Sequence, residues 1–200
     1  MAITLNGSGT VSGISAGGLP DGIIQSADLA SGVGGKILQV KSVSDTVRGS
    51  TGSFSCSQSY VDTVFTVTIT PTSSSNKMLI SAFFFGEGNF NEHEIQFQIE
   101  RTISGGATTY IRGATPGNRH ACIAIPPQGY AGFDDNSTPF NMAFNGLLDS
   151  PATTSAITYT LQCRAATGSR TVYYNRTTQD LDQAGYERGL SWLTVMEVSA

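Results

Sequence analysis

Three short patterns in the chain contain residue types that catalyse reactions or bind metal ions. The first, Gly13 to Gly17, matches the G-x-S-x-G pattern of serine hydrolases, whose serine must sit on a strained turn between a strand and a helix. Here the pattern lies in a glycine-rich stretch that predicts neither element, and the chain holds only two histidines that could act as a base. We therefore expect no serine nucleophile.

The other two patterns are acidic. Glu92 to Glu94 includes a histidine between two carboxylates, but a metal site needs three or more converging ligands and supporting residues around them, so a charged loop is favoured. Asp134 and Asp135 could act as paired carboxylates, or bind calcium together with Asn136, although a solvated turn is favoured. No pattern assembles a full catalytic set, so we expect a protein that is not an enzyme and holds no cofactor.

Binding surfaces are better supported than catalytic ones. Aromatic residues, among them Tyr173, Tyr174 and Tyr186, lie in or beside expected loops and are interleaved with planar polar side chains such as Arg176. Rings of this kind give a large contact area at low entropy cost, which suits recognition of a sugar or a protein. The same residue types are enriched at subunit interfaces, an alternative that is favoured over a ligand site. The candidate receptor-contact residues are Tyr110, Arg112, Asn118, Tyr130, Phe133, Asp134 and Asp135.

Composition excludes several classes of protein. The 200 residues carry 11 basic and 15 acidic side chains, and the basic ones are scattered, so no positive patch predicts nucleic-acid binding. No apolar run is long enough to span a membrane, and no secretion signal is recognisable, so we expect neither membrane insertion nor export. Cys56, Cys122 and Cys163 lie far apart without a metal-binding spacing, which favours small buried thiols over a disulfide or a metal site.

The stretch from Thr63 to Gly86 carries the clearest structural signal. From Val64 to Thr70 the side chains alternate, with Phe65, Val67 and Ile69 on one face, and this period of two predicts a half-buried strand. Because an isolated pair of strands is only marginally stable in water, the stretch requires further strands to cover it.

The residues that follow predict a loop and a second strand. Pro71 to Asn76 is rich in residues that fix φ or bond their own backbone, which is typical of an exposed loop. Lys77 to Phe85 is apolar on both faces, so we expect a strand that is covered on both sides.

The remainder of the chain predicts more short strands and no long helix. In Glu94 to Ile103, Ile95, Phe97 and Ile99 are expected to point inward. The polar residues between them are expected to face out or to face a partner subunit; these are Glu94, Gln96, Gln98 and Glu100. Ser104 to Gly106 predicts a hairpin turn, and Gly49 to Ser59 predicts a loop. About ten strands with such turns indicate an all-β, jelly-roll-like β-sandwich. The other strands are expected at Lys36 to Val43, Thr108 to Arg112, Arg119 to Ile125, Phe140 to Leu148, Ile157 to Arg164, Arg170 to Tyr174 and Leu190 to Val198.

Residues 1–35 form a segment of a different kind from residues 36–200, the expected head domain. The segment contains nine of the 23 glycines, no aromatic residue and only two charged residues, Asp21 and Asp28. Its aliphatic residues are too many for a simple solvated linker, although a disordered linker remains the alternative. We expect three copies to wind together into a thin stalk, at most about 115 Å long if fully extended. The candidate residues for trimer formation and attachment include Ile3, Leu5, Val11, Ile14, Leu19, Ile23 and Leu29.

Four blocks of sequence carry a resemblance to a known family. They are ITLNGSGTVSGISAGGLPDGIIQSADLASG near the N-terminus, GGKILQV at the junction, FTVTITPTSSSNKMLI in the central strand pair, and SWLTVMEV near the C-terminus. In this order they resemble tail-fibre or fibre-like virion structural proteins of tailed bacteriophages, many of which infect cyanobacteria and other aquatic bacteria. Residues 87–188 carry no matching motif.

The resemblance implies a homotrimer on the surface of the virion, made in the cytoplasm of the bacterial host. The N-terminal segment would attach to other virion proteins of the tail or capsid, and the globular β head would be exposed to bind a host-surface glycan or protein. The alternative is a capsid-surface fibre or decoration protein that stabilises or coats the shell. A third class, a glycan-cleaving depolymerase, would require paired carboxylates in a groove, for which Asp134 and Asp135 are the candidates.

Overall fold

The computed structural model describes residues 36–43, 51–88, 95–115, 117–126 and 137–200. The described residues form ten strands and no helix. Most strands are half-buried, with apolar residues on one face and polar residues on the other, as the alternating sequence predicts. The strands are β1 Ile37–Ser42, β2 Gly52–Cys56, β3 Val61–Ile69, β4 Lys77–Gly88, β5 Ile95–Ile103, β6 Thr108–Ile111, β7 Phe140–Asp149, β8 Ile157–Ala165, β9 Arg170–Tyr174 and β10 Trp192–Val198.

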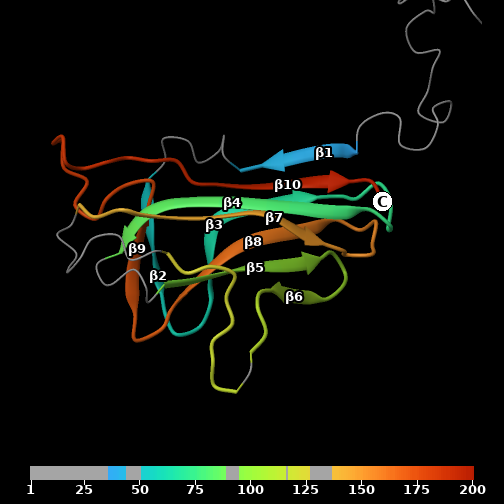
Figure 1. Ribbon diagram of the computed structural model, residues 1–200, viewed down its shortest axis with the longest axis horizontal. Coiled ribbons are helices and arrows are strands. Elements are labelled where there is room, and N and C mark those ends of the chain that lie inside the picture. Colours follow the sequence, from blue (N-terminus) through green and yellow to red (C-terminus); the bar gives the residue numbers. More distant parts are fainter. Residues whose placement is uncertain (1–35, 44–50, 89–94, 116, 127–136) are drawn as a thin grey trace, which may run out of the picture. The chain divides into compact units, whose positions relative to one another are not determined.

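The strands form two antiparallel sheets that share one hydrophobic core, which confirms the all-β sandwich. The larger sheet has six strands in the order β1-β10-β4-β9-β2, with β7 paired to the other side of β4. The smaller sheet has four strands in the order β3-β8-β5-β6. Figure 1 shows β1 and β6 at opposite margins of the sandwich.

Aromatic side chains fill the centre of the core. Phe84 of β4 is fully buried, and its ring centroid lies 5.2 Å from that of Phe97, 5.8 Å from that of Phe65 and 5.7 Å from that of Phe140. Edge-to-face and offset contacts of this kind stabilise a core beyond the burial of area alone. The alternation predicted for β3 is confirmed, because Phe65, Val67 and Ile69 are all buried.

A disulfide joins the two sheets. Cys56 at the end of β2 and Cys163 in β8 are both fully buried, and they are bonded to each other across 107 positions of sequence. The prediction that these cysteines are separate thiols is therefore wrong, because the sandwich brings together two strands that are far apart in the chain. Cys122 is a free, half-buried thiol.

Three other predictions about local structure are corrected. The expected loop Gly49 to Ser59 contains β2, which pairs with β9. The expected strand Arg119 to Ile125 is absent, and within it only Ile123 and Ala124 bond to Phe97 at the edge of β5. The second face of β4 is only half-buried in this chain, so β4 is not covered on both sides.

A buried carboxylate holds β1 and the loop before β4 onto β10. Glu197 is inaccessible to solvent, and its Oε1 accepts hydrogen bonds from Thr72 N (2.7 Å), Thr72 Oγ1 (2.8 Å) and Asn76 Nδ2 (2.6 Å). Its Oε2 accepts a bond from Gln39 Nε2 of β1 at 2.6 Å. Desolvation by burial would raise the pKa of Glu197, but the bonds from Asn76, Gln39 and Thr72 together lower it to about 2. A charged side chain is thus stable inside the fold.

Candidate functional site

The outer face of the smaller sheet carries a row of hydrogen-bonded polar side chains that runs from β3 across β8 and β5 to the residue after β6. Gln162 Nε2 of β8 donates to Asp62 Oδ1 of β3 at 2.7 Å, and Gln98 Nε2 of β5 donates to Gln162 Oε1 at 2.6 Å. Arg112, directly after β6, donates from a terminal nitrogen to Gln98 Oε1 at 2.9 Å. The row is held by β-sheet register, because Gln162 lies opposite both Asp62 and Gln98. The predicted outward orientation of Gln96, Gln98 and Glu100 is therefore confirmed in outline, although Gln98 is buried beneath its neighbours.

Beside this row, aromatic rings alternate with guanidinium groups. The guanidinium carbon of Arg164 lies 5.7 Å from the ring centre of Tyr60, and that of Arg112 lies 5.9 Å from the same ring. Arg112 also lies 5.3 Å from the ring centre of Tyr110. Cation–π contacts at these distances stabilise the arrangement and fix the orientation of each plane. We call Tyr60, Tyr110, Arg112, His120 and Arg164 the Tyr–Arg cluster.

The inner members of the Tyr–Arg cluster are tied down by hydrogen bonds. Arg164 is buried, and one of its terminal nitrogens lies 2.8 Å from Nδ1 of His120. The hydroxyl of Tyr60 donates to the carbonyl of Ala121 at 2.6 Å. Burial, with a smaller contribution from nearby Cys122, raises the pKa of Tyr60 to about 12, so its hydroxyl stays protonated and keeps this bond at neutral pH.

The outer members of the cluster are presented to solvent. Tyr110 is 49% exposed, and Arg112 is exposed as well. A surface that combines a held guanidinium with exposed ring faces can accept planar carboxylates, sugar rings or peptide groups without reorganising. The geometry therefore fits binding better than catalysis.

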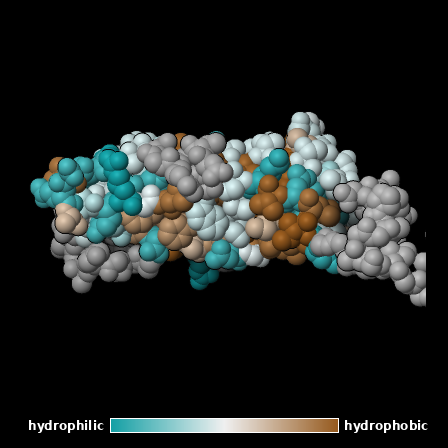
Figure 2. Space-filling view, turned by 90° about the horizontal axis from the view of Figure 1, so that it is seen from above, coloured by the Kyte–Doolittle hydropathy of each residue, from teal (hydrophilic) through white to brown (hydrophobic). Residues whose placement is uncertain are grey.

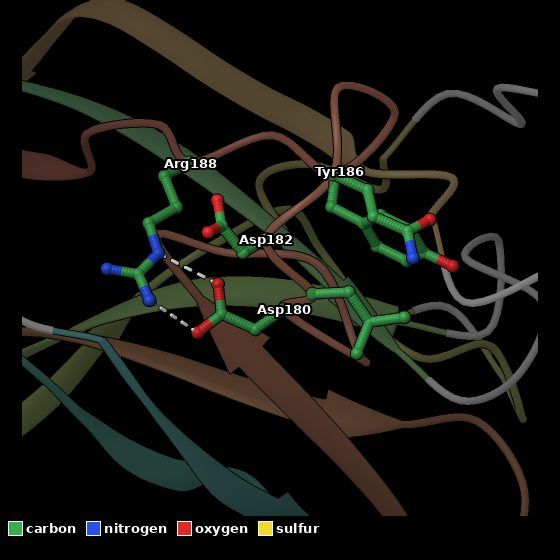
Figure 3. Close-up of a pocket in the computed structure, with 6 residues that line it drawn as sticks. Asp180, Asp182, Tyr186 and Arg188 are labelled. Atoms are coloured by element: carbon green, nitrogen blue, oxygen red, sulfur yellow. Dashed lines mark hydrogen bonds and ion pairs between the residues drawn. The ribbon is translucent and has the colours of Figure 1, made fainter.

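A second candidate lies in the loop between β9 and β10. Asp180, Leu181, Asp182, Gln183, Tyr186 and Arg188 line a pocket of about 390 Å³ in this loop. Figure 3 shows Arg188 facing Asp180, with Tyr186 on the other side of the pocket. The loop is anchored to the sandwich by buried Glu87 of β4, whose Oε2 accepts a bond from Thr178 N at 2.7 Å.

The carboxylate at the centre of this pocket is committed to an ion pair. Arg188 binds both oxygens of Asp180, at 2.8 and 2.7 Å, and this hydrogen bonding holds the pKa of Asp180 below its usual value. An acid catalyst must hold its proton near the working pH, so Asp180 cannot play that part near neutral pH. The ion pair leaves Asp180 as a fixed polar wall of the pocket.

The structure places only some of the sequence-predicted residues. Tyr110 and Arg112 come together in the Tyr–Arg cluster, and Asn118 is exposed in the loop that follows β6. Four candidates at residues 130–135, the Glu92 to Glu94 pattern and all the proposed attachment residues of the N-terminal segment lie outside the described residues. Those outside are Tyr130, Phe133, Asp134, Asp135, Ile3, Leu5, Val11, Ile14, Leu19, Ile23 and Leu29.

Sequence reasoning missed most of the cluster. Tyr60 and His120 are isolated in the sequence, and Arg164 lies within a strand. One sequence pattern pointed towards the cluster: Gln96, Gln98 and Glu100 alternate with apolar residues, which predicts that this strand has a polar face. The pattern does not show which residues of other strands lie beside that face. Only the strand order β8-β5-β6 shows that Arg164 and Arg112 approach the same ring.

Within the described ranges, no group of three or more His, Cys, Asp or Glu side chains is placed to hold a metal ion. The same residues include no helix that is long and apolar enough to cross a membrane. In comparisons with known protein families and with curated proteins, no match to the chain is found.

Proposed function

We propose that this chain is a virion structural protein of a tailed bacteriophage: a homotrimeric fibre with a jelly-roll-type head. Its residues 1–35 attach to the particle, and its head is exposed and binds a glycan or protein of the host surface. The sequence blocks described above and the all-β sandwich support this proposal. Both are compatible with a fibre head, and the Tyr–Arg cluster is the part of the head that we propose binds the host.

The observation that carries the proposal is the position of Arg112. Its guanidinium is bonded to Gln98 and lies near the rings of Tyr60 and Tyr110. An arginine that is oriented in advance binds carboxylates with little loss of side-chain entropy, and acidic sugars on bacterial surfaces carry such groups beside the ring faces that tyrosines contact. A single site of this kind is weak, but three copies per fibre and several fibres per particle raise the avidity.

A cell-binding experiment with paired variants tests the proposal. The full-length chain, labelled at its N-terminus with a fluorophore, is mixed with a panel of cyanobacterial and other aquatic bacterial cells, and cell-bound fluorescence is measured. We expect the native chain to bind some strains and not others. Tyr110→Ala is expected to reduce binding at least tenfold, because loss at one site is multiplied over three copies.

Tyr186→Ala in the β9–β10 loop is the matched control and is expected to bind like the native chain. The opposite result, with Tyr186→Ala losing binding, would move recognition to the loop pocket. Failure of the native chain to bind any strain counts against host recognition. That outcome favours a capsid-surface fibre or decoration protein, whose N-terminal segment would bind purified capsid proteins.

A further inference from the structure

The outer face of the larger sheet differs in character from that of the smaller sheet. In β10, Leu193, Val195 and Glu197 are buried, so the residues between them lie on the outer face. The same alternation in β4 turns its odd-numbered residues from Lys77 to Phe85 outward. We define the apolar face as the outer residues of β1, β10, β4 and β7.

Strand register assembles these outer residues into rows. Val40 of β1 lies opposite Met196, Met196 lies opposite Leu79 of β4, and Leu79 lies opposite Leu148 of β7. These four residues make an apolar row across four strands, and its two ends, Val40 and Leu148, are 53% and 58% exposed. A bulge in β1 places Ile37 opposite Val198 and extends the apolar surface. Figure 2, which looks onto the β1 side of the sandwich, shows hydrophobic residues gathered there.

A groove separates this row from a pair of stacked aromatic rings. Trp192 and Phe83 lie opposite each other, with ring centroids 6.4 Å apart. Between the pair and the apolar row, Ser42, Thr194 and Ser81 form a short polar row. The resulting groove of about 500 Å³ is lined by Ser42, Ser81, Asn145, Leu190, Trp192, Thr194 and Met196.

Charge is nearly absent from this surface. Among the described residues of β1, β10, β4 and β7, only Lys77, at the start of β4, adds a charged side chain to the outer face. In a sheet with one face in water, polar residues normally point to that face and apolar residues point to the core, as in the smaller sheet. A face with exposed Val and Leu side chains and half-buried Met and Trp side chains instead marks a surface that another molecule covers.

We infer that a second copy of this chain covers the apolar face. The inference rests on the proposed homo-oligomer and names the surface through which its heads meet. Only Lys36 separates residues 1–35 from β1, which begins at Ile37. In the sequence, the apolar face therefore begins directly after the segment that is proposed to associate. Association of those segments raises the effective concentration of one face near another.

The apolar face is about half the size of a stable protein interface. Four strands spaced about 4.8 Å apart and about seven residues long span roughly 400 Å², whereas a stable interface buries about 800 Å² per partner. The face alone therefore fits a weak contact between heads, which the proposed association of the chains would hold together. An edge strand such as β1, with apolar residues and no strand on its outer side in the described part of the chain, also favours a β-rich partner.

The experiment compares two valines on the full-length chain. Val40→Glu places a charge on the apolar face, and Val64→Glu places the same charge on the outer side of β3 in the other sheet, where Val64 is 47% exposed. A second pair is Leu148→Glu on the face and Leu181→Glu in the β9–β10 loop, where Leu181 is 43% exposed. Mass and dissociation constant are measured by sedimentation and light scattering over a range of concentrations.

Trp192 is the only tryptophan of the chain, and it lies in the groove, so it reports on the covering of the face. Quenching of its fluorescence by iodide is measured on the same samples. We expect Val40→Glu and Leu148→Glu to raise the dissociation constant at least tenfold and to make Trp192 several times easier to quench. The controls at residues 64 and 181 are expected to match the native chain.

Each other outcome overturns the inference in a distinguishable way. If the native chain is monomeric at all concentrations, both the homo-oligomer and the inferred contact between copies are refuted. If that monomer also shields Trp192 from iodide, another part of the same chain covers the face. If the chain is an oligomer but the face variants and their controls have the same effect on dissociation and on Trp192 quenching, the homo-oligomer is supported and the assignment of the apolar face to its interface is refuted. Cell binding by Tyr110→Ala tests the Tyr–Arg cluster separately, although the tenfold size of its loss applies only to an oligomer.

Discussion

Replacing Glu197 by glutamine removes a buried negative charge that surrounding hydrogen-bond donors stabilise. The carboxylate accepts four hydrogen bonds, three on Oε1 and one on Oε2. A glutamine can supply one oxygen for Thr72 and Asn76, but its amide nitrogen then faces the amide nitrogen of Gln39, and both are donors. Gln39 cannot rotate freely to resolve this clash, because the same nitrogen also donates to the carbonyl of Thr70 at 2.7 Å.

The pH dependence gives the size of the effect. The pKa of Glu197 is about 2 in the folded chain, compared with 4.5 for a glutamate side chain in water, so the folded state favours the charged form. Stability from this group is therefore complete above pH 4.5 and is lost as the pH falls towards 2. A shift of this size corresponds to about 3 kcal/mol at neutral pH.

Urea unfolding followed by circular dichroism, at one protein concentration and at several pH values from 7 to 2, measures this contribution. We expect Glu197→Gln to lose about 3 kcal/mol of unfolding free energy at pH 7, and the difference from the native chain to shrink towards zero near pH 2. Glu187→Gln, an exposed site, is the matched control and should follow the native curve. A constant difference between Glu197→Gln and the native chain from pH 7 to pH 2 would refute the reasoning, because the destabilisation would then not come from the charge.

Three further predictions concern other parts of the sandwich. Replacing Cys56 and Cys163 together by alanine is expected to lower the unfolding free energy by about 3 kcal/mol in oxidising buffer, and much less relative to the native chain in a strong reductant; equal losses in both buffers would show that the bond contributes little. Gly86→Ala is expected to destabilise the fold by about 3 kcal/mol, because a Cβ there would overlap the carbonyl oxygen of Tyr173; a native melting temperature for this variant would contradict the close approach of β4 and β9. Ultraviolet titration should show one tyrosine that ionises near pH 12, and Tyr60→Phe should remove that step; a titration that is unchanged in this variant would contradict the burial of the Tyr60 hydroxyl.

Much of the strand pattern could be predicted because alternation is a local property. In β3 the apolar residues Phe65, Val67 and Ile69 follow a period of two, and the structure buries all three. The hairpin between β5 and β6 could be predicted for a similar reason, since Gly105 adopts a positive φ of 71° that the turn requires. β2 was missed because its serine and glycine residues are typical of loops, and it becomes a strand only by pairing with β9.

The candidate site could be predicted only in part. Tyr110 and Arg112 stood out as an aromatic and a planar polar residue close together in the sequence, but their partner ring Tyr60 lies fifty positions earlier. β4 was expected to be covered on both sides from its composition alone. The apolar side chains on the outer side of β4 face away from the core, between β10 and β7.

By itself, the sequence determined which residues lie on the same side of each strand, because side-chain direction alternates along an extended backbone regardless of its neighbours. It also determined that residues 1–35 differ in kind from the rest, through their glycine content and lack of aromatic side chains. Only the tertiary structure decided which strands are adjacent and in what register. Register aligns Gln162 with Gln98 and extends one apolar row from β1 to β7. The packing of one sheet on the other joins Cys56 to Cys163, because contacts between distant segments do not depend on spacing along the chain.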